Sequence, residues 1–83
     1  MALLNKQFNF GLLKGTVYDF EVAGDVLPMH WHSPENVHIT VVGRGSFRTQ
    51  GPEDTWEKIV KAGDVIDWQA YQQHEFIALE DNS

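Results

Sequence analysis

Short runs of β-branched and aromatic residues, cut at regular intervals by turn residues, constrain the fold of this chain most. Apolar and polar residues alternate within the runs, and a period of two is typical of strands with one buried face. No segment carries a sustained helical period with caps. We therefore expect an all-β fold with strands near 16–22, 36–42, 46–50, 55–60, 64–68 and 74–79, and shorter ones at 8–10 and 26–32.

Glycine-rich breaks separate these runs at spacings of roughly 8–12 residues, which favours a sandwich or a barrel. Residues 43–45 (Gly-Arg-Gly) predict a hairpin turn, and residues 51–54 and 63–64 predict two further turns. The last run, 74–79, is followed only by a turn-like ending. We expect a returning strand beside it to be missing, so that the chain lacks a last strand or a partner chain covers that edge.

Length and charge narrow the class of protein. The 83 residues form one domain, 1–83. A domain this small often needs disulfides, a bound metal or a partner subunit in addition to its core. Cysteine is absent, which leaves a metal or a partner subunit. The net charge of −6 argues against nucleic-acid binding. The start lacks a secretory pattern and no apolar run reaches the ~20 residues of a membrane span, so we expect a cytoplasmic protein without a membrane segment.

Three histidines suit a metal site. His30 and His32 are two apart, and alternate residues of an extended segment face the same side. Pro28 before them favours an extended entry. His74 opens the last run on the face of Phe76 and Ala78, which we expect to point inward.

The spacing around these histidines resembles a known family. Gly24-x5-His30-x-His32-x3-Asn36-x6-Gly43 resembles the first cupin motif, G-x5-H-x-H-x3,4-E-x6-G. Gly63-x5-Gln69-x-Tyr71-x2-His74 resembles the second, G-x5-P-x-G-x2-H. The resemblance covers residues 12–80 and implies a cupin-type double-stranded β-helix, a jelly-roll barrel. It also implies that His30, His32 and His74 bind one divalent transition metal: iron, manganese, nickel or zinc.

The sequence departs from the family at the usual glutamate ligand. Asn36 occupies that position, and Glu35 one residue earlier would need a bulge to replace it, because a one-residue slip turns a side chain to the other face. Asn36 is therefore a candidate fourth ligand or a hydrogen-bonding neighbour. Three neutral imidazoles leave the ion at full charge, so we expect a site that favours anionic or chelating ligands.

Two further residues are candidates for catalysis. His38 shares a strand face with Asn36 and is either a pocket residue or a core histidine. Tyr71 either offers a hydroxyl at the pocket rim or packs as an aromatic. Trp31, between two ligands, should face away from the metal and pack between sheets or at a subunit contact. Trp56 and Trp68 are expected in the core or an interface.

The resemblance implies three alternatives for a small-molecule protein. The first is a dioxygenase-type enzyme acting on a small chelating substrate. The second is a metal-dependent isomerase or lyase with His38 as acid or base. The third is a non-catalytic binding module with a structural metal. A second apolar face on Val37, Ile39 and Val41 predicts a homodimer.

Overall fold

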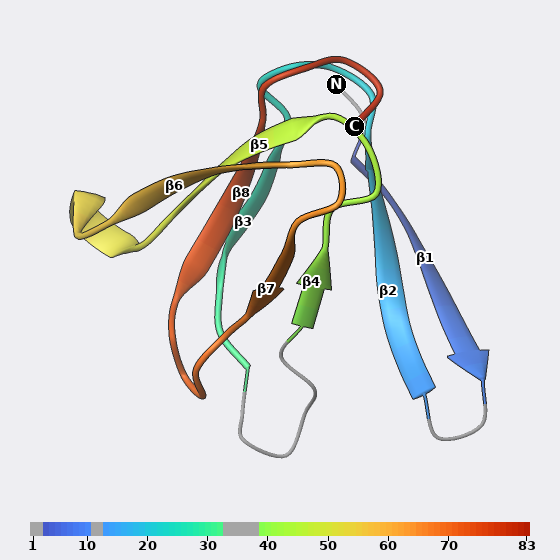
Figure 1. Cartoon of the computed structure of the whole chain (residues 1–83), viewed down its shortest axis with the longest axis horizontal. Helices are drawn as coiled ribbons and strands as arrows, with labels where there is room; N and C mark the ends of the chain where they lie inside the picture. Colours follow the sequence, from blue (N-terminus) through green and yellow to red (C-terminus); the bar gives the residue numbers. More distant parts are fainter. Residues whose placement is uncertain (1–2, 11–12, 33–38) are drawn as a thin grey trace.

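Antiparallel strands make up most of the computed structural model, which describes residues 3–10, 13–32 and 39–83 (Figure 1). Within those residues, the one element besides strands is a 3-10 turn at Pro52–Asp54. The strands are β1 Leu3–Phe10, β2 Leu13–Phe20, β3 Val26–His30, β4 Ile39–Val41, β5 Ser46–Gln50, β6 Glu57–Lys61, β7 Val65–Asp67 and β8 His74–Ala78. The predicted all-β class is confirmed.

The strands form one larger sheet and two pairs. The larger sheet has the order β3-β8-β5-β6, and the pairs are β1-β2 and β4-β7. β8 therefore has a partner along each edge, since Ile77 is opposite Val26 of β3 on one side and Arg48 of β5 on the other. The expectation that a strand is missing beside residues 74–79 is wrong, because β3 returns to that edge from the first half of the chain.

The turn at residues 43–45 is also different from the prediction. β4 pairs with β7, whereas β5 pairs with β6 and β8, so this turn carries the chain from one sheet to another and is no hairpin. Gly45 does adopt the predicted positive φ, at +77°. A glycine signal indicates the turn conformation but not which strands pair after it. Residues 51–54 do join a hairpin, between β5 and β6.

β1 is longer than the predicted run at 8–10. It pairs over its whole length with β2, from Leu3 opposite Phe20 to Phe10 opposite Leu13. Asn, Lys and Gln interrupt the apolar alternation in this part of the sequence, so its period-two signal is weak.

The interior lies on one face of the larger sheet. Along β8, the residues His74, Phe76 and Ala78 are buried, which confirms the predicted inward face of that strand. The buried apolar core consists of Phe20, Val42, Phe47, Val60, Trp68, Phe76 and Ala78, with Leu27, Trp56 and Ile66 packed against it. Trp68 and Trp56 thus occupy the core positions expected of them.

A β-bulge in β3 determines where His30 points. Leu27 is opposite Phe76 but His30 is opposite His74, so β3 holds one residue more than β8 over this interval. Residues three apart face opposite sides of a regular strand, so the bulge is what places His30 on the same face as Leu27. Pro28 fits here because it cannot donate a ladder hydrogen bond, and β3 is an edge strand.

The outward face of β4 is apolar. Ile39 is 56% exposed and Val41 is 65% exposed, as expected for a second apolar face on this run, although Val37 is outside the described residues. The homodimer that this face suggests stays a prediction. No helix among the described residues is long and apolar enough to cross a membrane.

Candidate metal centre

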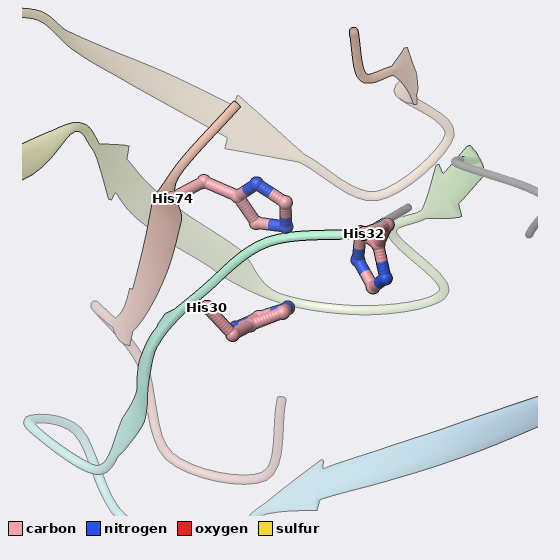
Figure 2. Close-up of side chains that lie close together, drawn as sticks. All are labelled: His30, His32 and His74. Atoms are coloured by element: carbon pink, nitrogen blue, oxygen red, sulfur yellow. The ribbon is translucent and has the colours of Figure 1, made fainter. Parts of the chain in front are cut away.

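The imidazoles of His30, His32 and His74 converge on one point (Figure 2). His30 ends β3, His32 follows two residues later, and His74 begins β8 directly opposite His30. Each ring offers one ligand nitrogen, and the three nitrogens are within 4.8 Å of one another. The predicted convergence of these three residues is therefore present, produced by the bulge in β3 together with the i, i+2 spacing.

Backbone carbonyls orient two of the rings. Nδ1 of His30 is 2.8 Å from the carbonyl oxygen of Pro28, and Nδ1 of His74 is 2.9 Å from that of Gln72. A carbonyl oxygen only accepts, so Nδ1 carries the proton in both rings. With the proton on Nδ1, a neutral ring carries its lone pair on Nε2, which is the tautomer that a metal ligand at Nε2 requires.

His74 Nε2 is a buried polar atom without a protein partner among the described residues. The His74 side chain is 0% exposed, and no hydrogen-bond partner lies within reach of this nitrogen. Leaving a buried acceptor unsatisfied costs about 1–3 kcal/mol. A cation at the point where the three rings meet would satisfy it.

The pKa of His74 favours the metal-binding form. This pKa is lowered from 6.5 to about 4 in all; burial is the largest cause, the Gln72 carbonyl opposes the shift, and the neighbouring imidazoles of His30 and His32 add to it. His74 is therefore neutral at physiological pH, with its lone pair ready to bind a cation.

Trp68 holds the His74 ring in its plane. The indole stacks on the imidazole with ring centroids 3.9 Å apart and an angle of 5° between the planes. Nε1 of Trp68 donates in turn to Oγ1 of Thr40, at 2.9 Å. Thr40 of β4 thus positions His74, the first residue of β8, through the buried indole of Trp68.

The three imidazole nitrogens suit a first-row transition metal of intermediate hard–soft character. Two nitrogens bound to one tetrahedral ion at about 2.1 Å are about 3.4 Å apart, so the present set needs to close by at most about 1.4 Å. Imidazole suits zinc, iron and nickel. No aspartate or glutamate joins the cluster within the described part of the chain.

The other predicted site residues, Asn36, His38 and Tyr71, are not part of the histidine cluster that the structure describes. Asn36 and His38 lie outside the described residues, as does Glu35. Tyr71 is described, and its ring is 59% exposed and packs on Trp31, with centroids 5.3 Å apart. Trp31 is exposed as well, so it does not pack between sheets as predicted, and its packing at a subunit contact stays a prediction.

The backbone of Tyr71 has a role that its side chain does not indicate. Its N–H donates to the carbonyl oxygen of His32, at 2.8 Å, and thereby ties the loop before His74 to the segment that carries His32. Its φ of +63° is in the left-handed region. The second cupin motif has glycine at this position, and glycine adopts such a φ without strain.

Sequence reasoning missed the parts that orient the rings. The carbonyls of Pro28 and Gln72 each precede their histidine by two residues, but a backbone group carries no sequence signal. The stacking of Trp68 depends on how β7 leads into the loop before β8, a tertiary relationship.

No family model matches the chain, and no curated protein or solved structure is significantly similar to it.

Proposed function

We propose that this protein is a small cupin-type metal protein in which His30, His32 and His74 hold one divalent transition ion. The observation that carries the proposal is the buried, unpartnered Nε2 of His74, directed at two further imidazoles. His74 is also buried and neutral, and carbonyl oxygens orient the rings of both His74 and His30. Imidazole nitrogens suit iron, nickel and zinc, whereas manganese prefers oxygen ligands.

The strand order supports a jelly-roll barrel as the framework. A jelly roll packs two antiparallel sheets of four strands. The order β3-β8-β5-β6 supplies one complete sheet, and β4-β7 with β2 supplies strands for the other. In this framework the metal site is at the mouth of the barrel, where β3 ends and β8 begins.

We propose further that the centre is enzymatic and of the dioxygenase type, acting on a small chelating molecule. A bound ferrous ion would supply redox chemistry toward oxygen. The three imidazoles hold the ion from one side and add no negative charge, which leaves coordination positions for an anionic, chelating substrate. Trp68 and Phe76, both buried, exclude water behind the His74 ring.

Oxygen consumption tests the enzymatic proposal. The purified protein is loaded with Fe(II) under anaerobic conditions and then exposed to oxygen with a panel of thiols, diketones and phenolic acids. We expect substrate-dependent oxygen uptake that His74→Ala abolishes. Turnover with Zn(II) in the absence of oxygen would instead indicate the isomerase or lyase alternative, and no turnover with any metal would contradict an enzyme.

A second candidate is a non-catalytic module with a structural metal. The observation that favours it is the pairing of His30 with His74 across the ladder, because an ion held by both would fasten the edge strand β3 to β8. Here chelation should unfold the metal-loaded protein cooperatively. A protein that keeps its folded state in chelator contradicts this candidate.

A further inference from the structure

A series of aromatic rings, those of His74, Trp68 and Trp56, leads from the candidate metal centre to the surface. The His74 imidazole stacks on the Trp68 indole, and the centroids of the Trp68 and Trp56 indoles are 5.8 Å apart, with 41° between their planes. His74 and Trp68 are buried, whereas Trp56 is only partly buried. The ring series therefore has one end at the metal site and the other end in contact with solvent.

The turn between β5 and β6 holds Trp56 in this position. Gly51 N–H donates to the carbonyl oxygen of Trp56, at 3.0 Å. A Cβ on Gly51 would collide with Nε1 and Cδ1 of the indole, so this edge of the ring lies directly on the glycine backbone. A glycine at position 51 thus permits the close approach that keeps Trp56 beside Trp68.

The neighbours of Trp68 differ in whether they can carry an electron. Among the described residues, the rings in contact with the Trp68 indole are those of His74, Trp56 and Phe76. A phenyl ring has no heteroatom that stabilises the loss of an electron, and it is much harder to oxidise than an indole. An electron taken from Trp68 can therefore be replaced through Trp56 but not through Phe76.

The hydrogen bond of Trp68 keeps the missing electron mobile. An indole that has lost one electron is a radical cation, and its N–H is strongly acidic. Nε1 of Trp68 donates to the hydroxyl of Thr40, which is a very weak base, and not to a carboxylate. The proton therefore stays on Nε1, and an electron can return from Trp56 without waiting for a proton to return as well.

We propose that Trp68 and Trp56 form a path for single electrons between the metal site and a soluble one-electron reductant at the surface, such as ascorbate or a thiol. This inference rests on the proposed function, because it needs a redox-active ion at the three histidines. The path supplies an electron when an oxidant at the site takes more electrons than the ion gives. It thereby protects the histidine ligands, which lie next to the oxidant, from oxidation.

The electrons balance for hydrogen peroxide as the oxidant. Peroxide takes up two electrons and two protons and becomes two molecules of water. A ferrous ion gives one electron and becomes ferric, and Trp68 gives the other. Trp56 then returns one electron to Trp68, and ascorbate returns one to Trp56 and releases a proton to water. Both indoles end in the state in which they began.

The test mixes Fe(II)-loaded protein with one equivalent of hydrogen peroxide, with and without ascorbate, and follows the tryptophan radical in frozen samples by electron paramagnetic resonance. The variants are Trp68→Phe, Trp56→Phe and Trp56→Tyr. Tyrosine differs from phenylalanine only by a hydroxyl but can be oxidised, so this pair separates electron transfer from packing. Trp31→Phe is the control, because Trp31 is exposed and its ring contacts Tyr71 and not the ring series. Each signal is divided by the iron content of the same sample.

We expect a tryptophan radical in the unmodified protein and in Trp31→Phe, and its loss in Trp68→Phe. Ascorbate should quench the radical at least about tenfold more slowly in Trp56→Phe, because it then reaches the buried Trp68 only when the fold opens locally. Trp56→Tyr should restore fast quenching. Oxidation of His74, mapped by mass spectrometry of peptides, should be greater in Trp56→Phe than in Trp56→Tyr.

Equal quenching in Trp56→Phe and Trp56→Tyr overturns the electron path, as does loss of the radical in Trp31→Phe. An unmodified protein that retains iron but forms no tryptophan radical also overturns the path, and it leaves the proposed metal centre standing. Failure of the unmodified protein to retain iron contradicts the metal centre, and the path with it.

Discussion

The indole of Trp68 lies flat against the imidazole of His74, with 3.9 Å between the ring centroids and 5° between the planes. Because His74 Nδ1 is held by the Gln72 carbonyl, the stack leaves the ring one orientation in which Nε2 faces His30 and His32. The positioning of a metal ligand by a residue that does not itself bind the metal is common in metalloproteins, and loss of such a residue weakens metal binding. One histidine of the candidate metal site thus packs in the hydrophobic core, against Trp68 and Phe76.

Thr40 tests this positioning. Thr40→Val removes the acceptor for Trp68 Nε1 and leaves a buried N–H unsatisfied, so the free energy of unfolding should fall by about 1–2 kcal/mol. Thr40→Ser keeps the hydroxyl and is the matched control. Urea unfolding of the metal-free proteins measures the change. Equal losses for the two variants would show that the hydrogen bond contributes nothing.

The pKa of His74 predicts acid sensitivity of the metal-free fold. The folded pKa of about 4 is below the unfolded value of 6.5, so between these pH values the unfolded chain binds a proton that the native state does not. Stability should therefore fall as the pH drops from 6.5 to 4, by up to about 3 kcal/mol, and His74 should cause no further change in stability above pH 6.5.

Urea unfolding in chelator at several pH values measures this dependence. His74→Gln removes the titrating group and should flatten the slope between pH 6.5 and 4, while other groups titrate as before. Identical slopes for the two proteins would contradict the assignment of the slope to His74.

Tyr71 carries backbone strain at its φ of +63°. Tyr71→Gly and Tyr71→Ala both remove the ring and its packing on Trp31, so they differ mainly in how they tolerate this φ. We expect the glycine variant to be about 1 kcal/mol more stable than the alanine variant. Thermal unfolding of the two side by side measures the difference, and an alanine variant of equal or higher stability contradicts it.

The charge of the donor set predicts ligand preference. Three neutral imidazoles leave a divalent ion its full charge, so a carboxylate should bind the loaded protein at least about tenfold more tightly than the matched amide. Calorimetric titration with a carboxylic acid and its amide, at one ionic strength, measures the ratio. Equal affinities would indicate that a further anionic group already neutralises the ion.

Much of the β structure could be predicted from the sequence. Residues 46–50 form a strand with the predicted bounds, and the inward face of β8 follows from alternation at His74, Phe76 and Ala78. Strand pairing could not be predicted, because alternation indicates a buried face and not a neighbour. The turn at residues 43–45 illustrates this. A glycine-rich turn can form a hairpin or carry the chain to another sheet, and here it carries the chain to another sheet.

The candidate site divides in a similar way. The i, i+2 spacing predicts that His30 and His32 face one side, and the resemblance to the second cupin motif implies that His74 joins them; the three rings do converge. The bulge that turns His30 inward depends on how β3 pairs with β8, and the orientation of His74 depends on Trp68 and on the Gln72 carbonyl. These contacts join segments far apart in the sequence or involve the backbone, where residue types carry no signal.

The most direct test of the central claim is the number of metal ions that each chain retains. Chelator-treated protein is dialysed against Co(II), freed of unbound ion and measured by elemental analysis, together with His30→Ala, His74→Ala and the exposed control Gln73→Ala. We predict one ion per chain in the unmodified protein and in the control, and none in either histidine variant. Failure of the unmodified protein to retain an ion, or retention of one ion after loss of His74, would contradict the proposed three-histidine metal centre.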